Sequence, residues 1–145
     1  MSVVAIKSSK AREHFSELLD DADKRPVFIN RKRDKYMVLP THFISRSDSW
    51  KIKISFGYDD TEGERVYFTK NAVFPDIIGW GNSKSEAISS FSEGITELCH
   101  DFYNNFHIYS AAPNRQQQIM PVLRLLSIIV SGGNISELII EEGKN

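Results

Sequence analysis

The sequence predicts an α+β protein in two parts, a β-α-β-β module followed by a β-β-β-α domain with an extra C-terminal helix. Three observations support this fold class. Apolar residues recur at helical spacing in 8–22, 83–102 and 116–130, they alternate at strand spacing in 27–39 and 50–70, and a polar run at 45–49 separates the two parts. We therefore expect two domains, residues 1–47 and residues 48–145.

The first part is predicted from one helix and three strands. The helix has a single apolar face at i, i+4, i+7, i+8 and i+11, and Ser9 is placed to accept a backbone N–H as its N-cap. Strands are expected at 3–6, 27–30 and 36–39, and the last two are joined by a turn at 31–34. The apolar face consists of Ala11, Phe15, Leu18, Leu19 and Ala22.

These residues resemble the Phd/YefM family of antitoxins. The shared order is a strand, Ser-x-Ala-Arg at 9–12, Phe-x-x-Leu-Leu at 15–19, a Pro-Val-x-Ile strand from 26 that ends in Asn30 and Arg31, and Val-Leu-Pro at 38–40. The resemblance covers residues 1–45. This chain departs from the family at the turn, where Arg-Lys-Arg-Asp at 31–34 replaces the usual glycine.

The resemblance implies a dimer that binds operator DNA in its own promoter. The positions that the family presents to DNA are Arg12 and Arg31 here, and a helix start also offers backbone N–H groups to phosphate. The alternative is a solvated helix end. The candidate DNA-binding residues are Lys7, Ser9, Lys10, Arg12, Arg31, Lys32 and Arg33.

Dimerisation is also expected on physical grounds. A module of this length has a high surface-to-volume ratio and buries little surface alone. A homodimer, or a higher even oligomer, would place two sets of arginines on one face and would read a palindromic operator.

Charge is distributed unevenly between the two parts. Residues 1–47 contain ten Lys and Arg against six Asp and Glu, a net charge of +4, whereas residues 48–145 contain eight against thirteen, a net charge of −5. The pattern favours nucleic acid as a partner of the first part and a basic partner for the second, although an imbalance of this size is also compatible with ordinary variation.

The second part begins with two antiparallel strands, 50–58 and 65–70, joined by an acidic turn that contains Gly63. Val66 and Phe68 share one face of the second strand. Ser83 and Glu86 form a capping box that opens a helix. We expect that helix to bury Ala87, Ile88, Phe91, Ile95, Leu98, Cys99 and Phe102.

Two strands, a Pro-Asp-Ile segment at 75–77, Gly-x-Ser at 81–83 and the Glu-Ala helix start at 86–87 together resemble the HicB-like antitoxin domain, over residues 50–106. That family has a partial ribonuclease-H-like β-β-β-α fold and holds a toxin. The resemblance therefore implies a cognate protein toxin, expected to be an mRNA-cleaving ribonuclease. The candidate toxin-binding acids, placed to oppose a basic RNA-binding surface, are Asp59, Asp60, Glu62 and Glu64.

The C-terminal region contains an apolar stripe wider than one neighbouring element would cover. A short strand is expected at Phe106–Tyr109, a helix from Gln116, a helix end at 132–133 and a last turn capped by Asn134. Leu125 and Ile128 widen the stripe. It can dock a toxin, contact a second protomer or pack on its own domain, and Leu125 and Ile128 are the candidates for toxin contact.

No arrangement of residues favours an enzyme. The strand at 50–58 holds no carboxylates for a pair of divalent ions until its acidic turn, and Cys99 and His100 point about 100° apart on a helix. Phosphate loops and nucleophile elbows are not found in the sequence. We expect no catalytic residues, no metal and no cofactor.

The single cysteine, Cys99, excludes a disulfide framework within one chain and suits the reducing cytoplasm. We expect a cytoplasmic protein without membrane contact, because the longest apolar run, 122–130, is too short to span a bilayer.

The sequence thus predicts an antitoxin of a type II toxin-antitoxin system that binds its toxin directly and represses its own operon. The alternative is a protein-interaction or inhibitor module that does not bind DNA and uses its N-terminal part only to dimerise.

Overall fold

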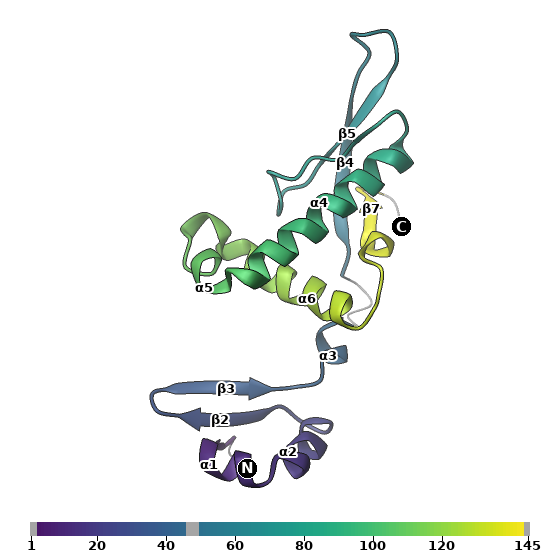
Figure 1. Ribbon diagram of the computed structural model, residues 1–145. Coiled ribbons are helices and arrows are strands. Elements are labelled where there is room, and N and C mark those ends of the chain that lie inside the picture. Colours follow the sequence, from purple (N-terminus) through teal and green to yellow (C-terminus); the bar gives the residue numbers. More distant parts are fainter. Residues whose placement is uncertain (1–2, 46–49, 144–145) are drawn as a thin grey trace. The chain divides into compact units, whose positions relative to one another are not determined.

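The computed structural model describes residues 3–45 and 50–143 and divides the chain into two compact units, Met1–Arg46 and Ser47–Asn145. Each unit contains its own small sheet and helices (Figure 1), so the predicted mixed α+β class is confirmed. Most of the polar run predicted as the boundary, residues 46–49, lies outside the described residues.

The first unit is a three-stranded sheet with short helices. Its sheet order is β1-β2-β3, in which β1 runs parallel to β2 and β3 runs antiparallel to β2. The elements are β1 (Ala5–Lys7), α1 (Ser8–Glu13), α2 (Phe15–Ala22), β2 (Val27–Arg31), β3 (Asp34–Val38) and α3 (His42–Ser45).

The predicted single helix is two helices, broken at His14, whose backbone φ is −121° and ψ is 43°. The predicted N-cap, Ser9, lies inside α1. The helix starts two residues earlier than predicted because Lys7, still paired to Asn30 in the sheet, is itself the N-cap residue, so the strand runs directly into the helix.

The break at His14 limits the core of the first unit. Ala11, Leu18 and Ala22 are buried as predicted, but Phe15 and Leu19 are 51% and 47% exposed. The first unit therefore leaves about half of two large apolar side chains in solvent.

The second unit is a four-stranded sheet with one face packed on helices. The strand order is β6-β5-β4-β7, with β4 antiparallel to β5 and parallel to β7. Figure 1 shows α4 crossing the sheet. The elements are β4 (Ile52–Asp59), β5 (Val66–Lys70), β6 (Trp80–Gly81), α4 (Lys84–Asn104), α5 (Phe106–Tyr109), the 3-10 helix η1 (Pro113–Gln118), α6 (Ile119–Val130), the 3-10 helix η2 (Ile135–Leu138) and β7 (Ile139–Glu141).

The predicted capping box is confirmed. The Ser83 hydroxyl accepts a hydrogen bond from the Glu86 backbone N–H at 3.1 Å, and the Glu86 carboxylate accepts one from the Asn82 N–H at 2.8 Å. The helix that follows, α4, buries the predicted face except for Ile88, which is half-buried.

The segment Phe106–Tyr109 is a helical turn and not the predicted strand. Its composition suits a strand, but Phe106 and Tyr109 both contact the buried ring of Phe102, with ring centroids 5.5 Å and 5.1 Å away. Residues three apart reach the same neighbour only on a helical turn.

The last helix packs on its own unit. Val122 and Leu125 of α6 are fully buried together with Ile52 and Ile54 of β4, in one apolar core. The chain then turns at Gly132, whose φ is 78°, and returns as β7, a strand that the sequence analysis missed. The predicted cap of the last turn is confirmed, because Asn134 accepts from the Ser136 N–H at 3.0 Å.

Candidate functional site

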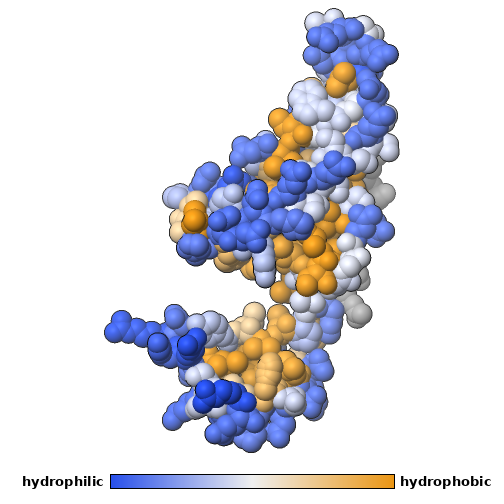
Figure 2. All heavy atoms as spheres, in the orientation of Figure 1, coloured by the Kyte–Doolittle hydropathy of each residue, from blue (hydrophilic) through white to orange (hydrophobic). Residues whose placement is uncertain are grey.

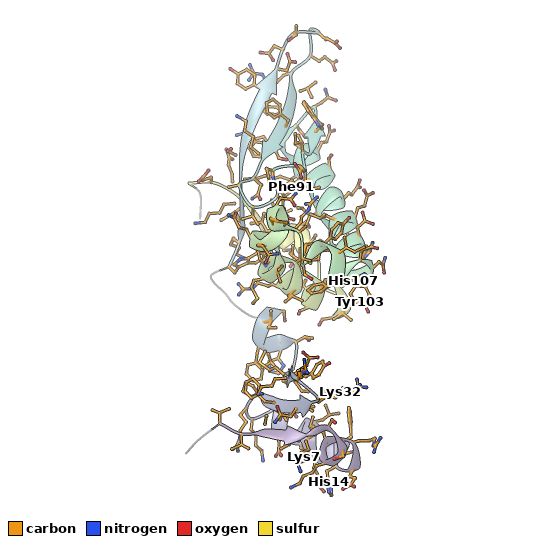
Figure 3. The ribbon with its side chains drawn as sticks, turned by 90° about the vertical axis from the view of Figure 1, so that its left-hand side faces the viewer. Lys7, His14, Lys32, Phe91, Tyr103 and His107 are labelled. Atoms are coloured by element: carbon orange, nitrogen blue, oxygen red, sulfur yellow. The ribbon has the colours of Figure 1, made fainter. Side chains whose placement is uncertain are left out.

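The carboxyl ends of two parallel strands place four of the predicted cations of the first unit at one end of its sheet, and the other two lie on the helix that begins there. Lys7, the last residue of β1, pairs with Asn30 near the end of β2, and α1 begins immediately after Lys7. The turn between β2 and β3, residues 31–34, follows at the same end of the sheet. Figure 3 looks onto this end, where Lys7 and Lys32 are labelled.

This basic end, as we call it, is exposed. None of its six cationic side chains forms an ion pair with a residue in the described part of the chain. Figure 2 shows strongly hydrophilic side chains over this end of the unit. Ser9 is also exposed on α1. The six cations are Lys7, Lys10, Arg12, Arg31, Lys32 and Arg33.

The tight turn gives the basic end a defined geometry. Arg31 and Asp34 are cross-strand partners, so only Lys32 and Arg33 connect β2 to β3. Lys32 has a φ of 55°, in the left-handed region where a side chain is disfavoured and glycine is the usual residue. The chain thus places a cation at a position that its backbone geometry would give to glycine.

His14 lies beside the basic end and not in the core. Its Nε2 is 3.9 Å from the carboxylate of Glu13, and its Nδ1 is 3.8 Å from that of Glu17, with the side chain about half exposed. The imidazole therefore sits among acids at the break between α1 and α2.

The first unit also has an open apolar groove of about 660 Å³. Val3 and Val4 line it and are 82% and 70% exposed. The rest of the lining is mostly apolar, with Asp21 and Arg25 as its two charged residues. An apolar surface of this kind on so small a core is a suitable surface for protein contact.

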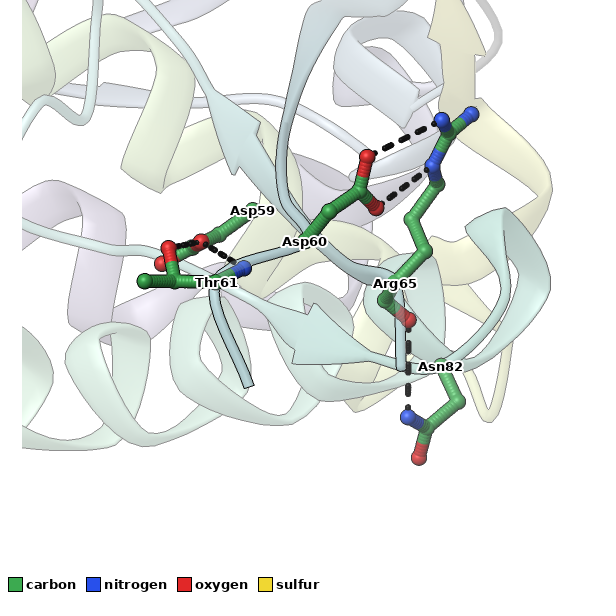
Figure 4. Close-up of polar contacts among 5 residues, drawn as sticks. All are labelled: Asp59, Asp60, Thr61, Arg65 and Asn82. Carbon is green, nitrogen blue, oxygen red and sulfur yellow. Dashed lines mark hydrogen bonds and ion pairs between the residues drawn. The ribbon is translucent and has the colours of Figure 1, made fainter. Parts of the chain in front are cut away.

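In the second unit, the acidic turn forms the tip of the β4–β5 hairpin, which extends beyond α4 (Figure 1). Asp60 binds Arg65 through two hydrogen bonds, from Nε at 2.9 Å and from the terminal guanidinium nitrogen at 3.2 Å (Figure 4). The Arg65 guanidinium also lies 4.1 Å over the ring of Tyr58. The side-chain hydrogen bond to Asp60 contributes most to raising the pKa of Arg65.

Asp59 is also engaged within the hairpin. Its carboxylate accepts from the Thr61 hydroxyl and, at 2.8 Å, from the Thr61 backbone N–H. These two hydrogen bonds, the hydroxyl first, lower the pKa of Asp59 below its ordinary value. Among the described residues, Glu62 and Glu64 form no ion pair, so these two predicted acids are the ones open to a partner.

The two apolar candidates for toxin contact differ in exposure. Leu125 has no exposed surface and belongs to the core of its own unit, so the expectation that it contacts a partner is corrected. Ile128 packs against the same core but keeps part of its surface in solvent.

The described residues include no group of three or more His, Cys, Asp or Glu side chains that could hold a metal ion. Burial raises the pKa of the Cys99 thiol to about 12, so the thiol stays protonated near neutral pH. Within residues 3–45 and 50–143, no helix combines the length and apolar character needed to cross a membrane.

Sequence reasoning gave no role to the lysines of the second unit. Lys51 and Lys53 alternate with the buried Ile52 and Ile54, so they point away from the core, and both line a groove of about 520 Å³ together with Lys70. The alternation of lysine and isoleucine in Trp-Lys-Ile-Lys-Ile, residues 50–54, is the sequence pattern that could have identified these outward-facing lysines.

Comparison with known proteins identifies a family and a similar solved structure. A PHD-like family model described as "Antitoxin of toxin-antitoxin, RelE / RelB, TA system" matches residues 1–138. Among curated proteins, none matches the chain in sequence. The crystal structure of an antitoxin part of a proposed toxin/antitoxin system from Syntrophomonas wolfei subsp. wolfei is similar, with a TM-score of 0.79 and 23% identity over 96% of this chain and 98% of that one. At this identity the likeness concerns the fold.

Proposed function

The chain belongs to the PHD-like family of antitoxins of toxin-antitoxin systems, and we propose that it both represses its own operon and neutralises a cognate toxin. In this proposal the first unit is a Phd/YefM-like module that dimerises and binds operator DNA. The second unit is a HicB-like domain that holds the toxin. Both actions are binding without turnover.

The observation that supports DNA binding most directly is the exposed basic end of the first unit. Six cations without described ion pairs lie at the end of β1, along the short helix α1 and at the turn from β2 into β3. Phosphate oxygens of duplex DNA supply the missing counter-charges, and an Arg side chain can also reach a base edge.

Dimerisation follows from the small core of the same unit. The open groove and the half-exposed Phe15 and Leu19 leave apolar surface that a second copy would cover. A two-fold dimer would present two basic ends to a palindromic site.

Fluorescence anisotropy on the promoter fragment upstream of the gene tests the repressor half. We expect tight, salt-dependent binding that Arg12→Ala with Arg31→Ala abolishes, while Lys24→Ala, which removes an exposed cation outside the basic end, leaves it intact. Each phosphate contact removed should reduce the slope of log K against log salt by about one. A folded dimer that binds no DNA at low salt would leave the alternative, an interaction module that only dimerises through its first unit.

We propose the acidic hairpin tip as the toxin-binding surface of the second unit. The toxin is expected to be an mRNA-cleaving ribonuclease, and a protein that binds RNA carries a basic surface for phosphate. Glu62 and Glu64 are exposed there, while the ion pair between Asp60 and Arg65 holds the tip in shape. Ile128 is the remaining apolar candidate for toxin contact.

Charge reversal tests this surface with the protein encoded by the adjacent gene. Glu62→Lys with Glu64→Lys should weaken the complex and reduce its salt dependence, because both changes turn attraction into repulsion. The matched control is Glu93→Lys with Glu97→Lys, two exposed acids on α4. Equal affinities for the hairpin variant and the unmodified protein would exclude this face as the toxin site.

A further inference from the structure

The sheet of the second unit has one face packed on helices and one face open. Side chains alternate along β4, so the buried Ile52 and Ile54 point to α4 and α6, and Lys53 and Ser55 point to the opposite side. We call this side the outer face. Strand register places eight side chains on it: Lys53, Ser55, Asp59, Val66, Phe68, Lys70, Trp80 and Ile140.

The outer face holds an aromatic pair. A Cβ atom added to Gly57 would lie 2.2 Å from Cζ of Phe68 and within 2.9 Å of two further ring atoms, so the Phe68 ring lies over the neighbouring strand. The Trp80 ring is next to it, with centroids 5.1 Å apart, and Trp80 is 52% exposed. Packing against Gly57 on the neighbouring strand explains the position of the Phe68 ring. It leaves a large part of the Trp80 indole in water.

A lysine contacts the aromatic pair on its Phe68 side, and two more line the groove beside it. The Lys70 Nζ lies 5.6 Å from the centroid of the Phe68 ring, and Lys70 is cross-strand partner of Ser55, one step along the outer face from Phe68. Lys51, Lys53 and Lys70 line the adjacent groove of about 520 Å³. Among the described residues lining this groove, Glu142 is the one acid, so the groove is basic although residues 48–145 carry a net charge of −5.

We propose that this outer face binds single-stranded nucleic acid, with a base stacked on Trp80 and the backbone phosphates held by Lys53 and Lys70. An exposed indole on the same face as Lys53 and Lys70 offers both contacts that single strands use, base stacking and phosphate pairing. A duplex keeps its base faces covered and cannot use the indole in this way. The face lies in the second unit and is independent of the operator-binding proposal for the first.

The same chemistry argues against two other occupants. In a two-fold pairing of this face with a second copy, the lysines of one protomer would oppose those of the other. An acidic protein segment would pair with Lys53 and Lys70 but would not need the exposed Trp80 ring. The role of Trp80 therefore separates nucleic acid from an acidic protein.

The test is fluorescence anisotropy with a labelled single-stranded RNA of about twelve nucleotides, a length that covers one such site. The full chain carries Arg12→Ala and Arg31→Ala, so that the basic end of the first unit contributes little. In this background we expect binding that Trp80→Ala weakens about tenfold, as loss of one base stack would, and that Trp80→Phe largely retains. Lys70→Ala should reduce the slope of log K against log salt by about 0.7.

Two matched controls keep the experiment specific. Tyr103→Ala removes an aromatic ring of α4 that is 68% exposed, and Lys24→Ala removes an exposed lysine of the first unit. Both should leave RNA affinity unchanged. The proposal is overturned if the background protein binds no RNA at low salt, if Tyr103→Ala weakens binding as much as Trp80→Ala, or if polyglutamate displaces the RNA while Trp80→Ala has no effect. The last result would assign the face to an acidic protein.

Discussion

Thr69 and Gly79 are joined by a reciprocal pair of hydrogen bonds. The Thr69 hydroxyl accepts from the Gly79 N–H at 2.8 Å, and the Thr69 N–H donates to the Gly79 carbonyl at 3.0 Å. Thr69 is fully buried, and no other residue of β5 places a polar side-chain group inside the core. This pair fixes the chain leading into β6 against β5, and therefore positions Trp80.

Replacing Thr69 with Val should destabilise the protein by about 1–3 kcal/mol, because the buried Gly79 N–H would lose its acceptor. The shape of the side chain is nearly unchanged, so the loss reports the hydrogen bond. Urea unfolding followed by far-UV circular dichroism measures it, and Thr69→Ser, which keeps the hydroxyl, should lose less. Equal stabilities of the Val variant and the unmodified protein would show that the hydroxyl is dispensable.

Gly79 is also constrained by its close approach to α4. A Cβ atom there would lie 2.2 Å from the carbonyl oxygen of Ala87 and 2.4 Å from the backbone nitrogen of Phe91. Since helix backbone cannot move aside as a side chain tip can, Gly79→Ala should cost about 1–3 kcal/mol or more. Gly57→Ala is the informative comparison, because its clash is with the tip of the Phe68 ring. A smaller loss for Gly57→Ala is expected in the same unfolding experiment.

The left-handed Lys32 links the stability of the first unit to its proposed binding function. Lys32→Gly should stabilise this unit by about 0.5–1 kcal/mol, because relief of the φ of 55° outweighs the greater freedom of glycine in the unfolded chain. Lys32→Ala removes the same charge but keeps a Cβ atom, so it gains nothing. Thermal melts should separate the two variants, whereas operator affinity should fall equally in both. If the Gly variant bound operator DNA more tightly than the unmodified protein does, a phosphate contact by Lys32 would be contradicted.

Local patterns predicted the elements whose partners are close in sequence. The capping box of Ser83 and Glu86, the buried face of α4 and the β2–β3 turn all depend on spacings of a few residues, and the structure has them. Acid placement at the hairpin tip was predictable in the same way, but the bidentate contact between Asp60 and Arg65 was not, because it depends on the curvature of the turn.

The failures involve contacts between distant or competing groups. The strand β7 pairs with β4 across more than eighty residues, a partner that no local pattern indicates. Val66 and Phe68 do share a face of β5, but the fully buried residue of that strand is Thr69, because Gly79 satisfies its hydroxyl. Leu125 belonged to a stripe that looked too broad for one neighbour, and the sheet and α4 together bury it.

The hairpin tip should respond to acid through Asp59. Its folded pKa is lowered by hydrogen bonds from the Thr61 hydroxyl and backbone N–H, so the ionised carboxylate stabilises the tip. This contribution is fully present above the ordinary pKa of 3.8 and is lost as the pH falls through the lower folded pKa. An NMR titration of the Asp59 carboxyl carbon should therefore give a midpoint below 3.8, with the Thr61 amide resonance moving in step. Thr61→Ala removes the hydroxyl, the larger of the two causes, and should return most of the midpoint shift while the backbone bond retains the rest. A midpoint at or above 3.8 in the unmodified protein would mean that the tip does not hold Asp59 in this geometry in solution.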